Sequence, residues 1–219
     1  MTTAFYSHAD CRAHDMGRGH PECPQRLDAI QDHLLATGLS DGLSMREAPM
    51  AGLEQIERAH SADYVQALRQ AIEPLVDSGD RLALDPDTSA GPGTWRAVMR
   101  GAGAALAATD AVIDGDVANA FCATRPPGHH ATHSSAMGFC FFNNVVIAAR
   151  HALEVRGLER VGIIDFDVHH GNGTEDIVAD DPRILMCSFF QHPLYPYTGA
   201  EPKGSNMVNV PLAPYTRGD

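Results

Sequence analysis

The feature that most constrains the fold is a regular alternation of short apolar segments with helix-like segments in the second half of the chain. Stretches typical of buried β-strands alternate there with stretches typical of helices, over residues 117–123, 145–155, 161–168, 174–179 and 183–189. Strands that alternate with helices favour a parallel sheet with helices on both faces. In such sheets ligands bind beyond the carboxyl ends of the strands, so we expect functional residues to follow the strands.

The first third of the chain predicts helices joined by loops. Apolar residues recur at helical spacing over residues 25–35 and after Ser61 and Thr94, and both of these residues, like Asn144 further on, can cap a helix. With 219 residues, 44% of them hydrophobic, the chain can bury a sizeable core. Because it has no internal repeat and no Gly/Pro-rich linker, we expect one domain over residues 1–219.

The formal net charge of −12 argues against direct binding to nucleic acid, which usually requires a basic face. An acidic surface could attract cationic substrates such as lysine-rich tails or polyamines, although solubility alone would account for it. The five cysteines are odd in number and widely spaced, so neither a disulfide framework nor a zinc knuckle is predicted. With no apolar run long enough to cross a bilayer and no secretory signal at the start, we expect a cytoplasmic protein without a membrane segment.

The strongest motif is the run from Ile163 to Gly173, which reads IIDFDVHHGNG. Side chains alternate along a strand, so Asp165, Asp167 and His169 are expected on one face of the strand. Two carboxylates and an imidazole would be costly to leave unpaired at a strand end, and a divalent cation would relieve that cost. A carboxylate and a histidine with an open position suit catalytic zinc. The alternative is an exposed strand end whose acids are simply solvated.

Two further motifs follow the strand predicted at 117–123. The segment RPPGHHA places His129 and His130 on a stiff loop, where imidazoles suit proton transfer near neutral pH. An isolated pair of histidines is more often a surface feature, and its expected place beside the metal motif is what favours catalysis. The segment GFCFFNN can line an apolar channel. We expect Phe139 in that channel, and Phe141 and Phe142 in the core.

Taken together, these motifs resemble the histone deacetylase family. RPPGHHA, GFCFFNN and DFDVHHGNGT occur in that order, and GHPECPQRL at residues 19–27 is similar to the family's opening pattern. The resemblance extends over essentially the whole chain, and the family includes bacterial acetylpolyamine and histone deacetylase-like amidohydrolases. It implies an α/β fold of the arginase/deacetylase type, with a parallel sheet sandwiched between helices. It also implies zinc-dependent removal of acyl groups, acetyl above all, from lysine or polyamine amines.

The resemblance further implies roles for individual residues. Asp167 and His169 would bind the catalytic zinc, while His130 would be the general base with His129 as its electrostatic partner. Asp165 would orient His129, and Asn172, which stands where many relatives have Asp, would orient His130. Gly138 and Phe139 would line the substrate tunnel. Arg26 would line an internal channel, and Asp87 would lie at the substrate rim. A structural monovalent cation, K⁺ or Na⁺, would be held by Asp165, Asp167, His169, Ser188 and Phe189, partly through backbone oxygens.

The match to the family is incomplete in one respect. The family's third zinc ligand, an Asp, and its oxyanion donor, a Tyr or His, belong to later segments that have no counterpart in these 219 residues. We therefore expect a domain that is incomplete at its C-terminal end, with the later strands of the sheet missing. One alternative is a non-catalytic remnant that binds only metal or partners. Another is an arginase-like binuclear hydrolase, which would need further Asp ligands. The sequence leaves open the choice between acylated lysine and acylated polyamine, and also whether the chain forms homo-oligomers.

Overall fold

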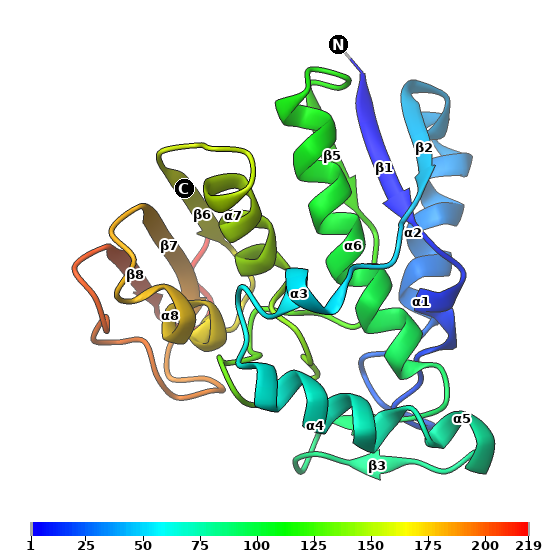
Figure 1. Ribbon diagram of the computed structural model, residues 1–219. Helices are drawn as coiled ribbons and strands as arrows, with labels where there is room; N and C mark the ends of the chain where they lie inside the picture. The colour runs from blue at the N-terminus through cyan, green and yellow to red at the C-terminus, as the bar shows by residue number, and fades with distance from the viewer. Residues whose placement is uncertain (1, 219) are drawn as a thin grey trace.

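The computed structural model describes residues 2–218, which form two three-stranded parallel sheets, a short antiparallel hairpin and the helices packed around them. The elements in chain order are β1 (Thr3–Ser7), α1 (Asp10–Ala13), α2 (Gln25–Ala36), η1 (Leu39–Gly42), β2 (Leu43–Glu47), α3 (Leu53–Ile56), α4 (Ala62–Ile72), α5 (Leu75–Ser78), β3 (Leu82–Ala83), β4 (Ser89–Ala90), α6 (Thr94–Ile113), β5 (Asn119–Cys122), α7 (Asn144–Glu154), β6 (Val161–Asp165), α8 (Asn172–Val178), β7 (Ile184–Gln191) and β8 (Met207–Leu212). Figure 1 shows the two sheets beside each other. The predicted α/β class is confirmed.

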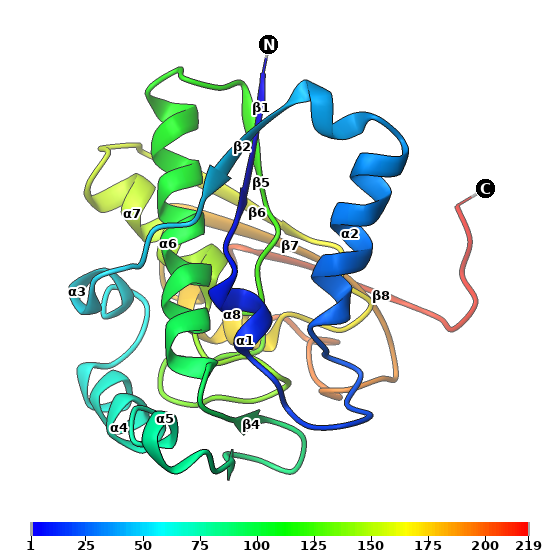
Figure 2. The ribbon, with the colours of Figure 1, turned by 90° about the vertical axis from the view of Figure 1, so that its right-hand side faces the viewer.

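The first sheet has the strand order β2-β1-β5 and is covered by helices on both faces. Side chains of β1 alternate between the two layers. Ala4 and Tyr6 belong to the same apolar cluster as Ala104 of α6, whereas Phe5 packs with Leu27 of α2. Figure 2 shows α2 and α6 on opposite sides of these strands. The predicted arrangement of a parallel sheet between helices is therefore found here.

The second sheet, in the order β6-β7-β8, is covered on one face in the part of the chain that the structure describes. Helices α7 and α8 lie on that face, and Ile163, Ile184 and Met186 are buried in the main core beneath them. The opposite face carries apolar side chains that remain exposed, among them Ile164 at 68% and Leu185 at 53%. Because parallel sheets are normally covered on both faces, this apolar face is an incomplete part of the fold.

Strands β5 and β6 each have one neighbour among the described residues, so each leaves an edge without a strand partner. A cavity of about 420 Å³ separates them, lined by residues of β5, β6, α6 and α7. The strand predicted over residues 117–123 is present as β5, but the expectation that it is buried is wrong, since Phe121 is 53% exposed. The reason is its position, because an edge strand lacks the neighbour that would cover it.

The helix starts are close to those predicted. Ser61 caps α4 as expected, through its side-chain oxygen. Helix α7 is capped by Asn143, whose side chain accepts from the amide of Val146, so the predicted cap Asn144 is one residue late. Thr94 is the first residue of α6 and not its cap, because its hydroxyl accepts a hydrogen bond from an amide upstream. Within residues 2–218, no helix combines the length and apolar character needed to cross a membrane.

Candidate active site

A buried ion pair anchors the loop that follows β5. Arg125 is fully buried, and its guanidinium donates to both carboxylate oxygens of Glu22 at 2.6 Å. It also donates to the backbone carbonyls of Cys11 and His14, at 2.8 Å each. A guanidinium held in this bidentate way fixes both position and orientation. The loop therefore has a rigid base four residues before the first of the two histidines.

His129 and His130 lie side by side on this loop, with ring centroids 4.0 Å apart, and each has its own partner. Nδ1 of His129 is 2.8 Å from Oδ2 of Asp165, and Nδ1 of His130 is 2.7 Å from Oδ1 of Asn172. These are the pairings that the resemblance implied, although the roles attached to them remain predictions. Because both partner oxygens act as acceptors, each Nδ1 carries a proton, and Nε2 of His130 is left to accept another.

The two histidines differ in the direction of their pKa shifts. Burial, reinforced by the neighbouring His129, lowers the pKa of His130 to about 4. Burial also disfavours the charged form of His129, but its hydrogen bond to Asp165 and the charge of that carboxylate outweigh burial and raise the pKa of His129. The same contact outweighs the burial of Asp165 and lowers the pKa of that carboxyl. At neutral pH, His130 is therefore the neutral ring of the pair.

Asp167 and His169 lie in the turn between β6 and α8. The expectation that they share a strand face with Asp165 is wrong, because β6 ends at Asp165. Side-chain bonds to the backbone end the strand. Asp165 accepts from the amide of Asp167 at 3.1 Å, and Asp167 accepts from the amide of His169 at 2.8 Å. The same turn brings Nδ1 of His169 to 3.0 Å from Oδ1 of Asp167, so carboxylate and imidazole still converge.

This pair offers an oxygen and a nitrogen donor of the kinds that zinc takes in proteins. The side chains of Asp167 and His169 are 49% and 37% exposed, which leaves room for further ligands. Asp165 does not join them, because it faces His129. Within residues 2–218, no group of three or more His, Cys, Asp or Glu side chains is placed to hold a metal ion. The residues present thus fit two positions of a zinc site.

The residues implied in a monovalent-cation site are brought together in part. The register of β6 and β7 pairs Asp165 with Ser188 at the end of the sheet. Ser188 is fully buried, and its hydroxyl lies 3.0 Å from Nδ1 of His170. Phe189 turns its side chain to the exposed face of the sheet, so only its backbone could contribute to such a site. The cation itself stays a prediction.

Gly138 and Phe139 border the histidine pair. A Cβ on Gly138 would come within 2.5 Å of Cδ2 of His130, and its φ is +56°, so both space and conformation require glycine. The amide of Phe139 donates to Oγ1 of Thr88 at 2.9 Å, and its half-buried ring meets the ring of His20 edge-on, with centroids 4.7 Å apart. Phe139 is thus not sealed in the core, in contrast to Phe141, which is fully buried as expected, as is Phe142.

Asp87, which the resemblance placed at the substrate rim, lies beside His20, the ring that contacts Phe139; its role at the rim stays a prediction. Its carbonyl oxygen is 3.1 Å from Nε2 of His20, and its amide donates to Asp85 at 2.9 Å. Burial and the neighbouring carboxylate of Asp85 raise the pKa of Asp87, while hydrogen bonds from the backbone and from Thr88 outweigh burial and lower that of Asp85. Two acidic groups therefore lie next to Thr88, which accepts a hydrogen bond from the backbone of Phe139.

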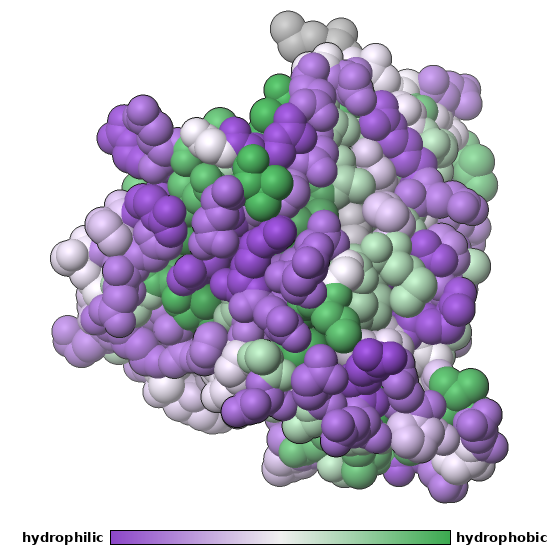
Figure 3. All heavy atoms as spheres, in the orientation of Figure 1, coloured by the Kyte–Doolittle hydropathy of each residue, from purple (hydrophilic) through white to green (hydrophobic). Residues whose placement is uncertain are grey.

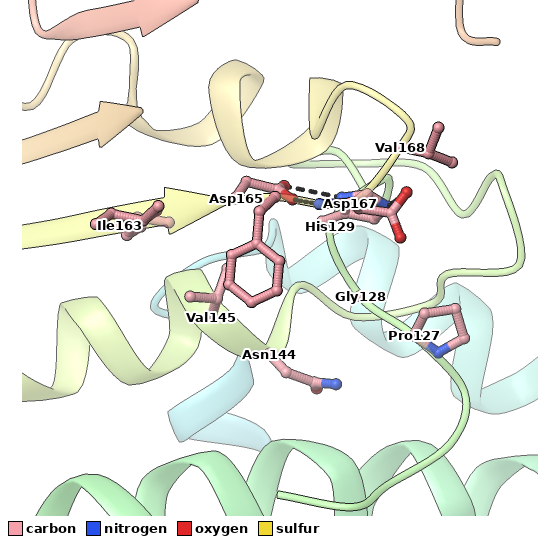
Figure 4. A pocket seen from close by; sticks show the side chains of 11 residues that line it. Pro127, Gly128, His129, Asn144, Val145, Ile163, Asp165, Asp167 and Val168 are labelled. Atoms are coloured by element: carbon pink, nitrogen blue, oxygen red, sulfur yellow. Dashed lines mark hydrogen bonds and ion pairs between the residues drawn. The ribbon is translucent and has the colours of Figure 1, made fainter. Parts of the chain in front are cut away.

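Two cavities adjoin the site. One of about 570 Å³ lies beyond the carboxyl end of β6 and is lined by His129, Asp165 and Asp167, as Figure 4 shows. Another of about 590 Å³ also touches Asp167 and is lined by Arg26, whose guanidinium donates to the carbonyl of Thr124 at 2.7 Å. Arg26 thus lines a cavity that reaches Asp167, and its place in an internal channel stays a prediction.

One residue at the site was not predicted. Tyr195 packs edge-on against His130 and His169, with centroid separations of 5.1 and 6.0 Å. Burial raises its pKa, and the charges of Asp87 and Asp85 raise it further, which places the ring near the acidic rim. Its only signal in the sequence is its place shortly after β7, because carboxyl ends of parallel strands meet at one edge of a sheet.

Comparison with known proteins identifies the family. Residues 20–219 match the model of the histone deacetylase domain. An uncharacterised protein of Synechocystis is 41% identical over 98% of this chain and 70% of its own length. A histone deacetylase-like amidohydrolase of Pseudomonas aeruginosa is 39% identical over 90% of this chain and 52% of its own length. The mouse polyamine deacetylase HDAC10 is 38% identical over 96% of this chain and 34% of its own length.

A solved structure agrees with these sequence matches. The crystal structure of the HDA15 HD domain superposes with a TM-score of 0.87 and 32% identity, covering 96% of this chain and 61% of that one. The chain spans between 34% and 70% of the length of the relatives named above. Fold, ordered motifs and paired histidines all agree with these matches, and the chain belongs to the histone deacetylase family.

Proposed function

We propose that this chain carries most of the active site of a zinc-dependent deacylase, which hydrolyses acyl amides of lysine or polyamine amines. The observation that carries the proposal is the pairing of His129 with Asp165 and of His130 with Asn172. Both pairs lie beside the carboxylate of Asp167, whose Oδ1 is 4.0 Å from Nε2 of His129. Two oriented imidazoles next to an oxygen and a nitrogen donor suit metal-assisted hydrolysis.

Asp167 and His169 would hold the zinc, and a structural K⁺ or Na⁺ would occupy the nearby strand ends. Zinc held there supplies polarisation of the acyl carbonyl and acidification of a water molecule. His130, with its Nδ1 proton held by Asn172, accepts the proton of the attacking water at Nε2. Asp165 favours the protonated form of His129 next to the reacting atoms, and a protonated histidine then gives its proton to the leaving amine.

The substrates in this proposal are acylated lysine in a peptide and acylated polyamine. The mouse relative is named a polyamine deacetylase, and the Pseudomonas relative an amidohydrolase. An acylated polyamine keeps its remaining amines protonated, and a lysine-rich peptide keeps its unacylated lysines, so the net charge of −12 and the acidic groups at Asp85 and Asp87 would attract both. The face of the molecule in Figure 3 is largely hydrophilic, with apolar residues in smaller areas.

Other parts of the proposal rest on composition. The acidic net charge supports a protein that does not bind nucleic acid directly, and we propose neither a membrane partner nor an obligate second subunit. Homo-oligomers remain compatible with the exposed sheet edges. The five cysteines are all free, which supports the cytoplasm as the proposed compartment.

A non-catalytic remnant is the second candidate. The observation in its favour is that residues 2–218 bring together two zinc donors and no third. Two donors hold zinc less firmly and leave its geometry underdetermined. We therefore expect the 219-residue chain alone to hydrolyse acyl amides poorly, even when it binds zinc.

The test combines zinc binding with hydrolysis. Zinc affinity is measured by calorimetric titration of the chain, and turnover is measured on an acetyl-lysine peptide and on an acetylpolyamine, with His130→Ala as the control. Zinc binding together with turnover that His130→Ala removes supports the deacylase. Zinc binding without hydrolysis of either substrate, in every form of the protein that contains these residues, supports a non-catalytic remnant.

A further inference from the structure

A buried histidine beside the proposed metal ligands takes no part in the proposed chemistry. His170 is fully buried, and both of its ring nitrogens have partners. Nδ1 lies 3.0 Å from Oγ of Ser188, and Nε2 lies 3.1 Å from Oε2 of Glu175. The ring also packs on Phe190, with centroids 4.6 Å apart. His170 thereby connects the metal-ligand turn to both β7 and α8.

Glu175 extends this connection to two more segments. Its side chain is 1% exposed, and its second oxygen, Oε1, accepts from the side chain of Asn209 at 2.9 Å and from the amide of Lys203 at 3.2 Å. A carboxylate can accept from three donors at once, whereas a glutamine would turn an N–H toward at least one of them. Nε2 of His170 must therefore carry a proton, which it donates to this carboxylate.

The loop that carries Tyr195 closes over the same ring. A Cβ on Gly199 would lie 2.5 Å from Cδ2 of His170, and its φ is +91°, so the backbone approaches the imidazole more closely than any other residue would allow. Asn209 also donates to the carbonyl of Gly199 at 2.9 Å. The bond from Asn209 and the close contact with His170 thus hold the loop at Gly199, while Tyr195 of the same loop packs against His130 and His169.

We propose that His170 and Glu175 are positioning residues that couple the turn carrying Asp167 and His169 to the loop carrying Tyr195. The turn follows β6 and the loop follows β7, so sheet pairing alone does not fix one against the other. The buried pair supplies a hydrogen-bonded link beside the ring contact of Tyr195 with His169. Losing either member leaves the other buried without its partner, which loosens both segments together. The proposal relies on the proposed function only for the identity of the bound metal.

The test begins with the metal-free chain. Amide hydrogen exchange is followed by mass spectrometry in peptides covering residues 166–173 and 195–203, for the wild type, His170→Gln and Glu175→Gln. We expect both variants to raise exchange in both segments. A variant that loosens one segment and leaves the other as in the wild type would overturn the coupling.

Zinc affinity gives the second readout, by competition with a chromogenic chelator. Both variants should bind zinc roughly 10- to 100-fold more weakly, the usual effect of losing a group that orients a metal ligand. The matched control is His60→Gln, since His60 is equally buried and bonded at both nitrogens, but to backbone at Thr132 and Asn143. It should lower thermal stability and leave zinc affinity unchanged. Equal zinc affinities in all variants would overturn the proposal.

A milder variant covers the case in which His170→Gln does not fold. Asn209→Ala removes one donor to Glu175 and the bond to Gly199, and it should raise exchange in both segments by a smaller factor. No change in either segment would contradict the coupling. A wild-type chain that binds no zinc, with the exchange coupling intact, would refute the metal site and leave the positioning pair standing.

Discussion

Oδ1 of Asn172 lies 2.7 Å from Nδ1 of His130, and this contact fixes the tautomer of the proposed base. The amide itself is oriented, because its Nδ2 lies 3.4 Å from Sδ of Met137, which leaves Oδ1 toward the ring. Asn172 offers this ring a neutral acceptor. His130 is therefore held in place without a charge that would favour its protonated form.

Removing the acceptor should slow turnover. In the catalytically active form of the protein, we expect Asn172→Ala to lower kcat about 10- to 100-fold with little change in KM, because the base would lose its orientation and not its substrate. Asn172→Asp, which keeps an acceptor in the same place, should retain most of the activity. Steady-state kinetics on an acetyl-lysine peptide check both variants. A change confined to KM would assign Asn172 to substrate binding.

Metal binding should depend on two residues of the turn after β6. In the catalytically active form of the protein, Asp167→Ala or His169→Ala removes one of the donors that converge there, so each should abolish tight zinc binding. Asp63→Ala is the matched control, because it removes an exposed carboxylate at the start of α4. Calorimetric titration with zinc measures all three. Wild-type affinity and stoichiometry in either donor variant would show that zinc binds elsewhere.

The sequence predicted the alternating strands and helices of the second half of the chain, because these follow from local periodicity. It read the first third as helices joined by loops and so missed β1 and β2. The pairing of His129 with Asp165 was implied by the resemblance to the family. The sequence pattern missed the end of β6 at Asp165, since that depends on side chains that bond to the backbone of the next residues. It also missed Tyr195, which lies in an irregular segment where no period applies. The exposure of Phe121 depends on which strand lies beside β5, and no local pattern encodes that.

Phe139 should contribute to substrate binding. Its ring is half-buried beside His20, and its backbone is held by Thr88, so it forms a firm apolar border next to the histidine pair. We expect Phe139→Ala to raise KM for acetyl-lysine peptides several-fold, in line with the loss of a buried aromatic contact. Phe121→Ala, which removes an exposed aromatic ring remote from the site, should leave KM unchanged. Equal KM values for the two variants would exclude Phe139 from the tunnel.

Stability should fall as the pH is lowered from about 6.5 to 4, because His60 is buried as a neutral ring. Burial outweighs its backbone hydrogen bonds and lowers its pKa from 6.5 to about 4. The unfolded chain binds a proton in this range and the folded chain does not, so stability is fully present above pH 6.5 and is lost toward pH 4. The slope approaches about 1.4 kcal/mol per pH unit.

Urea unfolding at several pH values measures this dependence. His60→Gln should flatten the slope while lowering the stability at neutral pH, since the amide replaces the imidazole imperfectly. Some dependence should remain, because burial and the nearby Arg125 also lower the pKa of His14 to about 3. An unchanged slope in the variant would show that His60 does not titrate as argued.

The 219-residue chain should self-associate in solution through its second sheet. Strand β6 presents an edge without a strand partner in the described part of the chain, and Ile164 and Leu185 stand 68% and 53% exposed on the uncovered face of the same sheet. Unpaired edges and exposed apolar faces of parallel sheets favour pairing with another chain. Light scattering coupled to size-exclusion chromatography should therefore show a molecular mass that increases with protein concentration.

Ile164→Lys should reduce the association, whereas Leu35→Lys, at an equally exposed site on α2, should not. Association that responds equally to both substitutions, or a chain that stays monomeric at high concentration, would contradict a role for this sheet.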